Sequence, residues 1–360
     1  MTKKWILPLL ICFALLGNAQ NGAPASPYYS GFNWTLTGSA LKDALATKIT
    51  ITHSRFISYS NIWEADKITD MDPADNSKVL LVYGWENGTD TDVTNDRNRD
   101  KTNNGAANGQ WNREHVFAKA LGVPALIETN LGDGGSDAHH IRPADVQRNN
   151  TRGNLKFAAG SGNSGAVTGG WYPGDEWKGD VARMIMYMYL RWGTQCLPTY
   201  ASVGTPVSTD ANMTDLLLQW NADDPVSAIE DARNSYHNSS AGFAQGNRNP
   251  FIDNPYLATV IWGGPNAQNR WPNVFLSNET WTQPQVVSVF PNPSTDGRCQ
   301  IAATEGLEQV QVYNLSGQLV YAMSFLQSPT QWTVEGLTPG FYMVKVKTVH
   351  VQGTYKYWVK

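Results

Sequence analysis

Two short stretches of the sequence carry most of the side chains that could do chemistry. They read NREHVFAKALG over residues 112–122 and SDAHHIRPADVQRNNTRGN over residues 136–154. The second stretch holds two adjacent histidines, three arginines and several asparagines, with few apolar residues among them. Packing alone does not require this mixture, whereas a site for a negatively charged substrate would use it.

The carboxylate and amide side chains in these stretches suit a hard divalent cation. Mg²⁺ prefers oxygen ligands, namely carboxylates, amide carbonyls, water and substrate phosphate, and Ca²⁺ or Mn²⁺ would accept similar donors. Glu114 offers the carboxylate. Candidate amides follow at Asn149, Asn150, Asn154 and Asn163. Glu114 and His115 would point to opposite faces of a regular strand, so a loop or a bent strand is needed for both to reach one metal.

The histidine and the arginines supply the rest of the expected chemistry. A neutral imidazole at His115 could deprotonate a water molecule, and guanidinium groups at Arg142 and Arg152 could hold a phosphate. Together with the cation, these groups predict metal-assisted phosphodiester hydrolysis. Additional substrate contacts are expected from Arg113, His140, Asn149 and Arg248. Structural ion pairing is the alternative for each arginine, and His139 is the less favoured partner of the histidine pair.

These residues resemble the endonuclease I family of secreted and periplasmic nucleases, which are of the ββα-metal or His-Me finger type. The matching motifs are N-R-E-H-V-F and D-A-H-H-I-R-P-A-D-x-x-x-N-N-x-R-G-N, followed by WNADDP at 220–225 and QGNRNPFID at 245–253. The resemblance implies an α+β fold in which a two-stranded ribbon and a helix hold one divalent metal. It implies cleavage of DNA, often of RNA too, with His115 as general base and Glu114 as metal ligand. A downstream asparagine, Asn154 or Asn163, would be the second ligand.

The elements that must position these motifs can also be read from the sequence. Apolar side chains at helical spacing predict helices over residues 41–53, 179–192, 213–220 and 224–236, the last with Pro225 at its first position. Residues 79–83 form an apolar run that predicts a buried strand, and residues 86–110 predict a long loop. Ala118 and Asn254 stand where other family members often have proline and histidine.

The C-terminal part of the chain has a different hydropathy pattern. Short alternating runs separated by turn signals predict a small antiparallel β-sandwich. Four of its segments resemble the C-terminal sorting domain of the type IX secretion system: PNPSTDG (291–297), VQVYNLSGQLV (310–320), LTPGFYMVKV (337–346) and YKYWVK (355–360). The resemblance implies export through that machinery, followed by release or surface attachment. A generic immunoglobulin-like domain is the alternative.

The N-terminal sequence indicates where the protein is located, and the net charge limits how it can bind nucleic acid. Residues 1–19 have the basic, apolar and small-residue regions of a secretory signal peptide, and their apolar region is too short to span a membrane. The expected organisation is a signal peptide (1–19), a nuclease domain (20–271), a linker (272–288) and a sorting domain (289–360). A net charge of −4 provides no overall attraction for a polyanion, so nucleic acid must bind a local patch. We expect a secreted or surface-held monomer with no membrane span, in which Cys196 and Cys299 stay unpaired.

Two other function classes fit parts of the sequence. A zinc hydrolase could use His115, His139 and His140 with a carboxylate, although no fixed zinc-binding spacing is present. A non-catalytic glycan-binding protein would suit the many tryptophans and tyrosines, but it leaves residues 112–154 unexplained. The sequence therefore favours a metal-dependent endonuclease, without deciding between DNA and RNA or naming the ion.

Overall fold

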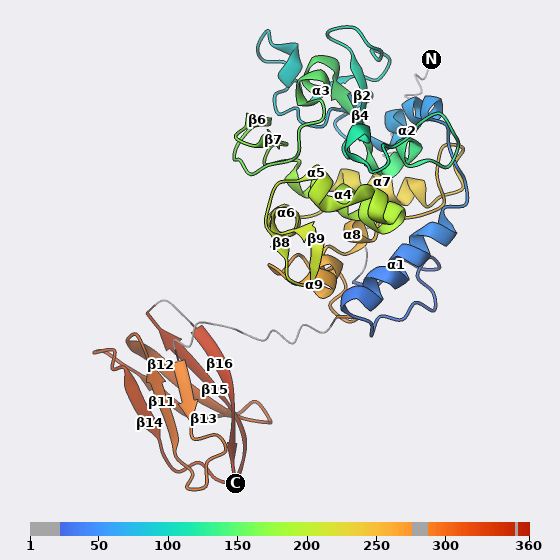
Figure 1. The fold of residues 1–360 in the computed structure, drawn as a ribbon. Coiled ribbons are helices and arrows are strands. Elements are labelled where there is room, and N and C mark those ends of the chain that lie inside the picture. Colours follow the sequence, from blue (N-terminus) through green and yellow to red (C-terminus); the bar gives the residue numbers. More distant parts are fainter. Residues whose placement is uncertain (1–21, 276–286, 350–351) are drawn as a thin grey trace, which may run out of the picture. The chain divides into compact units, whose positions relative to one another are not determined.

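The computed structural model describes residues 22–275, 287–349 and 352–360, and the predicted signal peptide lies outside them. The chain divides into two compact units, Met1–Leu276 and Ser277–Lys360. The first unit mixes helices with short strands, and the second consists of strands (Figure 1). Cys196 and Cys299 are free and buried, one in each unit, as predicted. No helix among the described residues is long and apolar enough to cross a membrane.

A buried helix, α4 (Lys178–Trp192), organises the first unit. Its side chains are buried from Gly179 to Leu190, so it lies inside the core rather than on the surface. It packs against α1 (Gly38–Thr52), α6 (Asp215–Asp223) and α8 (Pro250–Asp253) (Figure 1). The predicted helix 179–192 is confirmed, although it is buried on all faces rather than along one apolar stripe, and its methionines fill the core.

The remaining helices and strands of the first unit are short. The helices are α2 (Ile62–Thr69), α3 (Val146–Arg152), α5 (Pro198–Ala201), α7 (Ala228–His237) and α9 (Tyr256–Trp262). The strands are β1 (Met71–Asp72), β2 (Asp75–Leu80), β3 (Asn98–Asp100), β4 (Trp111–His115), β5 (Ile141–Asp145), β6 (Gly165–Val167), β7 (Gly170–Tyr172), β8 (Pro206–Val207) and β9 (Asp210–Thr214). They pair antiparallel, in the orders β1-β2-β3, β4-β5, β6-β7 and β8-β9.

Strands β4 and β5 and helix α3 bring the two chemistry-bearing stretches together. The register of the ribbon pairs Glu114 with Arg142 and His115 with Ile141. Helix α3 follows β5 directly, because the Asp145 carboxylate accepts hydrogen bonds from the backbone N–H groups of Gln147 and Arg148 and so caps its first turn. The ribbon thus fixes Glu114, and the capped helix presents its asparagines beside it.

Several predicted boundaries shift in the structure. The helix predicted from residue 224 begins at Ala228, because Ser227 and Glu230 form a capping box there, so Pro225 is not its first residue. The predicted buried run 79–83 is buried, but β2 ends at Leu80. The chain then turns, and Tyr83 adopts a positive φ of 76° that is strained for a residue with a side chain. The predicted loop 86–110 contains strand β3.

The second unit consists of two antiparallel sheets. Strands β10 (Val287–Phe290), β11 (Cys299–Ala303) and β14 (Gln331–Val334) form one sheet. The other contains β12 (Leu307–Asn314), β13 (Leu319–Ser324), β15 (Gly340–Thr348) and β16 (Gln352–Val359), in the order β13-β12-β15-β16. Alternate residues of β12 and β15, among them Val310, Val312, Val344 and Val346, are buried in one apolar core. The period-two pattern therefore predicted this unit correctly.

Candidate active site

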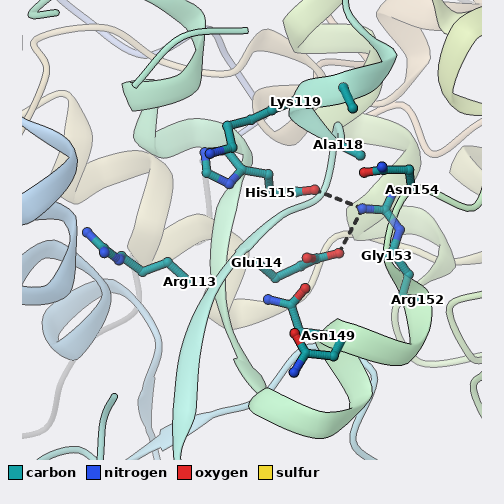
Figure 2. A pocket seen from close by; sticks show the side chains of 11 residues that line it. Arg113, Glu114, His115, Ala118, Lys119, Asn149, Arg152, Gly153 and Asn154 are labelled. Carbon is teal, nitrogen blue, oxygen red and sulfur yellow. Dashed lines mark hydrogen bonds and ion pairs between the residues drawn. The ribbon is translucent and has the colours of Figure 1, made fainter. Parts of the chain in front are cut away.

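A cavity of about 310 Å³ lies beside strand β4 and helix α3. It is lined by Arg113, Glu114, His115, Ala118, Lys119, Ala120, Asn149, Asn150, Arg152, Gly153 and Asn154. Figure 2 shows Glu114, Asn149, Arg152 and Asn154 grouped on one side of β4, with the Arg113 side chain pointing to the other side. The structure thus gathers residues from both sequence stretches around one opening.

Glu114 is the only carboxylate that the described lining contributes, and its position is tightly set. Its side chain is 2% exposed. Its Oε1 atom accepts hydrogen bonds from the Tyr83 hydroxyl at 2.9 Å and from Arg152 Nη1 at 3.0 Å. Burial raises the pKa of Glu114, whereas Arg152 and Tyr83 oppose the rise. Both contacts use Oε1, which leaves Oε2 to face the cavity.

Arg152 holds Glu114 and the end of strand β4 in place instead of binding a phosphate. It is 1% exposed, and besides Glu114 its guanidinium donates to the backbone carbonyls of His115 at 3.0 Å and Val116 at 2.8 Å. These three contacts engage both terminal nitrogens, and the remaining nitrogen, Nε, has no partner but is buried. The predicted phosphate contact of Arg152 therefore does not fit the structure, because the carboxylate and strand β4 already occupy the guanidinium.

His115 is held in one tautomer. Its Nε2 atom lies 2.8 Å from the carbonyl oxygen of Gly135. A carbonyl only accepts, so Nε2 carries the ring proton and Nδ1 keeps its lone pair. Burial lowers the pKa of His115 well below its ordinary value of 6.5, and the nearby His140 lowers it further. The ring is therefore neutral at pH 7, the state that a general base requires.

The loop that holds His115 has little room for side chains. A Cβ atom on Gly135 would lie 2.4 Å from the carbonyl oxygen of Ile127. The preceding carbonyl, that of Gly134, lies 2.9 Å from Nε2 of His140. Two consecutive glycine carbonyls therefore set the tautomers of both histidines, a role that the sequence reasoning missed. The Gly-Gly pair in TNLGDGGSD was its signal.

Asn149 is the best held of the three amides that follow β5 in this cavity, the others being Asn150 and Asn154. It lies on α3 and is half-buried, and its Nδ2 donates to Asn112 Oδ1 at 2.8 Å. Because the NH₂ group is engaged, its carbonyl oxygen remains available as an acceptor. Asn154 also lines the cavity but is exposed. The prediction that Asn163 is a metal ligand does not fit, because Asn163 lies in another cavity, with Gly84, Trp85 and Trp177.

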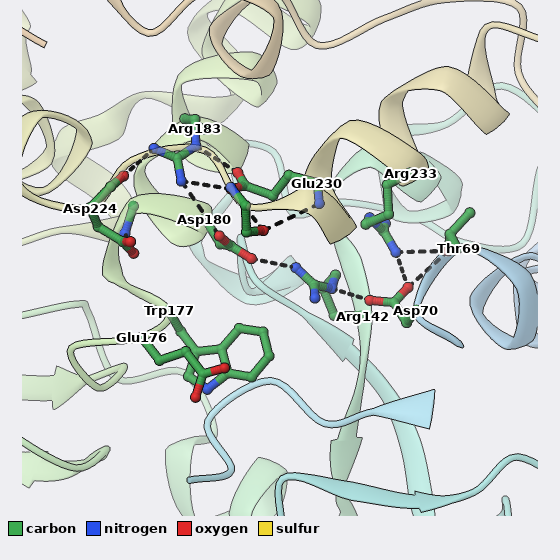
Figure 3. Close-up of polar contacts among 12 residues, drawn as sticks. Thr69, Asp70, Arg142, Glu176, Trp177, Asp180, Arg183, Asp224, Glu230 and Arg233 are labelled. Atoms are coloured by element: carbon green, nitrogen blue, oxygen red, sulfur yellow. Dashed lines mark hydrogen bonds and ion pairs between the residues drawn. The ribbon is translucent and has the colours of Figure 1, made fainter. Parts of the chain in front are cut away.

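Arg142 does not line the cavity and is not a phosphate contact. It is fully buried; its Nε donates to Asp70, and its Nη1 donates to Asp180 at 2.9 Å. The same two carboxylates also meet Arg233 and Arg183 (Figure 3). The prediction from sequence fails because acidic residues from distant parts of the chain neutralise this arginine. Such an arrangement belongs to the scaffold.

The other predicted substrate contacts also have internal partners. Arg248 forms a bidentate ion pair with Asp253 and lies outside the cavity lining, so its predicted role does not fit. His140 is fully buried behind His115, with 5.5 Å between the ring centroids, and does not face the cavity. Arg113 lies at the rim, with its guanidinium 3.5 Å from the ring centroid of Tyr59.

The structure does not favour the zinc-hydrolase alternative. The ring of His139 packs against Tyr187 and His237 instead of joining His115. Throughout residues 22–275, 287–349 and 352–360, no three histidine, cysteine, aspartate or glutamate side chains gather as a metal site would need. A site of mixed carboxylate and amide oxygens is a different donor set, which suits Mg²⁺ rather than zinc.

Comparison with known proteins places both units. Residues 37–256 match the Endonuclease I family, and residues 288–360 match the secretion system C-terminal sorting domain. An extracellular ribonuclease of Bacillus amyloliquefaciens is 36% identical over 310 residues, which cover 73% of this chain and 100% of the relative. An extracellular ribonuclease of Bacillus subtilis (strain 168) is 40% identical over 256 residues, which cover 67% of this chain and 82% of the relative.

Proposed function

Because this chain belongs to the Endonuclease I family, we propose that it hydrolyses phosphodiester bonds of RNA and DNA with the help of a divalent cation. The chain is a nuclease enzyme, and it is secreted or held at the cell surface, since it carries a sorting domain and its relatives are extracellular nucleases. RNA is included because the two relatives bear the name ribonuclease, and DNA because of the endonuclease I motifs. The ion that we favour is Mg²⁺, ahead of Ca²⁺ and Mn²⁺.

A single observation supports the proposal best: an oxygen-donor cavity adjoins a histidine whose tautomer is fixed. His115 Nε2 is bound to the Gly135 carbonyl, so only Nδ1 can take a proton from water. Glu114 lines the same cavity, although it neighbours His115 on one strand. The ribbon ends at His115, and this end allows both side chains to border one opening.

The residues of this cavity fit an oxygen-preferring cation. Glu114 Oε2 and the Asn149 carbonyl oxygen are the donors that the protein would offer, with water and phosphate oxygens completing the set. Arg152 and Tyr83 hold Glu114 in place, and Asn112 holds Asn149. When bound, the cation supplies positive charge to the phosphate and to the leaving oxygen. Asn154 is the alternative to Asn149, but it lacks a comparable restraint.

The proposed reaction is a one-step displacement at phosphorus. His115 Nδ1 accepts a proton from a water molecule, and the water oxygen forms a bond to phosphorus as the bond to the 3′ oxygen breaks. The leaving oxygen then takes a proton from solvent. General-base assistance of this kind contributes about 10²–10⁴-fold to the rate, so the cation and substrate positioning must supply the remainder.

The test is cleavage of supercoiled plasmid and of RNA by the purified mature chain, with Mg²⁺, Ca²⁺, Mn²⁺ or a chelator. His115→Ala should lower the rate by about 10²–10⁴-fold while circular dichroism and melting temperature show a folded protein. Normal nicking by a folded His115→Ala variant would reject the proposed mechanism. Activity that survives chelation would reject the cation.

The ligand assignment has its own readout. Asn149→Ala should raise the concentration of Mg²⁺ that gives half-maximal activity, and Asn154→Ala should raise it less. Direct titration of Mg²⁺ by calorimetry provides the same comparison without any turnover. A larger effect of Asn154→Ala in both measurements would reverse the assignment.

A further inference from the structure

A nuclease site requires a basic side chain that can reach substrate phosphate, and the described lining of the cavity offers three. They are Arg113, Lys119 and Arg152. Arg152 is 1% exposed and is occupied by Glu114 and two backbone carbonyls. It balances the charge of Glu114, and its one unpartnered nitrogen, Nε, is buried.

Arg113 is engaged in a different way. Its Nη1 donates to the Tyr59 carbonyl, and its guanidinium lies against the rings of Tyr59 and Trp63, at 3.5 Å and 4.3 Å from their centroids. Figure 2 shows it pointing away from Glu114 and Asn149. Moving it to a phosphate bound near Glu114 would break both stacking contacts.

Lys119 differs from both arginines. It follows β4 by four residues and begins a short 3-10 helix, and its side chain is 37% exposed. Its ammonium pairs with Glu128, whose side chain is 29% exposed. An ion pair that is open to water contributes only about 0–1 kcal/mol, so a phosphate could displace the carboxylate.

Glu128 stands where a polyanion would be repelled. Its Oε2 atom lies 3.9 Å from Nε2 of His115, in addition to its contact with Lys119. The carboxylate therefore borders the ring that is proposed to act as the base. It lies on the loop whose Ser136 and Gly135 contact the backbone of residues 127 and 128.

We propose that Lys119 binds a backbone phosphate of the nucleic acid, and that Glu128 occupies this ammonium when no substrate is bound. This inference rests on the proposed nuclease function and adds to it a substrate-binding residue and an internal competitor. On binding, the Lys119 ammonium exchanges a carboxylate for a phosphate, and Glu128 turns to solvent. The ammonium is a flexible point charge, and its contact with the Tyr59 ring is a long one, at 5.8 Å to the centroid, so the exchange costs little packing.

The test measures binding in the His115→Ala background, so that labelled RNA and DNA oligonucleotides are not cut during the titration. Fluorescence anisotropy over a range of KCl concentrations gives Kd and its salt slope. Lys119→Met should weaken binding about tenfold, the size of one charged hydrogen bond. It should make the slope of log K against log salt shallower by about 1. Lys119→Arg should stay close to the parent in both.

A double-mutant cycle separates substrate binding from a merely structural role. Glu128→Gln should tighten binding by roughly two- to fivefold, the size of an exposed ion pair, and this gain should vanish when Lys119→Met is also present. If Lys119 only anchored the loop, both single variants would weaken binding. Lys78→Met is the matched control, because Lys78 pairs with Asp75 on β2, is 41% exposed and lies outside the cavity lining.

The outcomes distinguish this inference from the function beneath it. If the unaltered chain cleaves nucleic acid but Lys119→Met keeps the parental salt slope, only the Lys119 assignment is overturned. If the unaltered chain cleaves neither RNA nor DNA with any of the cations, the nuclease mechanism itself fails and this inference fails with it.

Discussion

Two groups of charged residues flank the β4-β5 ribbon, and they differ in whether a ligand can reach them from a cavity. Around Arg142, carboxylates and guanidinium groups neutralise one another inside the protein (Figure 3). Around Glu114, one arginine and one tyrosine contact a single oxygen, and the remaining oxygen faces a cavity (Figure 2). The first group stabilises the ribbon, and the second leaves donors for an incoming ligand. Access from a cavity, rather than charge alone, therefore distinguishes the site from its scaffold.

The largest expected effect comes from removing Arg142 from its buried ion pairs. Arg142→Met leaves Asp70 and Asp180 short of one partner each, so the free energy of unfolding should fall by about 3–5 kcal/mol. Urea denaturation measures it. At a temperature where the variant is folded, its kcat should stay close to the parental value, because Arg142 lies outside the cavity lining.

Arg97→Met is the matched control for that change. Arg97 pairs with Glu176 at the surface, with side chains that are 33% and 40% exposed, so its loss should cost only about 0–1 kcal/mol. A stable Arg142→Met variant that has lost activity would contradict the division into scaffold and site, and would return Arg142 to the catalytic machinery.

The sequence could reveal the members of the site that are adjacent in the chain. Glu114 and His115 lie next to each other, and the asparagines of α3 follow β5 directly, so local motifs contained them. The roles of the arginines could not be read in this way. Arg142 meets Asp70, 72 residues away, and Arg152 meets Glu114, 38 residues away. Whether a guanidinium binds substrate or stabilises the fold depends on the carboxylates that the fold brings to it. A single sequence does not specify those pairings.

The fold shows the same division between local and distant information. Alternation along β12 and β15 predicted the second unit, because a strand with one buried face records its neighbours in its own pattern. By contrast, β2 ends at Leu80 although the apolar run continues, since the backbone N–H of Val82 donates to the carbonyl of Pro143 on β5 and Tyr83 turns toward Glu114. The contacts of a second element override the local preference there.

A smaller effect is expected from the loop that sets the tautomer of His115. Gly135→Ala would place a Cβ atom 2.4 Å from the Ile127 carbonyl oxygen, so the loop must move and the Gly135 carbonyl must shift away from Nε2. We expect kcat to fall by about 10–100-fold, the loss typical when a supporting hydrogen bond to an active-site histidine is disturbed. KM should change much less, because no phosphate contact is removed.

Gly165→Ala tests whether that loss is specific. Gly165 has nothing within 4 Å of its added Cβ atom and lies on β6, outside the cavity lining, so kcat should be unchanged. Steady-state kinetics on one RNA substrate compares the two variants. An unaltered kcat for a folded Gly135→Ala variant would mean that the backbone carbonyl does not control the base.

The smallest expected effect is the change in the free energy of unfolding with pH that His139 and His140 cause. Burial lowers the pKa of His139 and of His140 to about 4, so between about pH 4 and 6.5 the unfolded chain binds protons that the folded chain does not. Stability is therefore fully present above pH 6.5 and falls as pH decreases, by roughly 1.4 kcal/mol per pH unit for each such histidine. Denaturation at pH 7, 6 and 5 should show this slope. In His140→Gln, which can still donate to the Gly134 carbonyl, the slope should be shallower by one histidine's share; an identical slope would show that His140 titrates alike in the folded and unfolded chain.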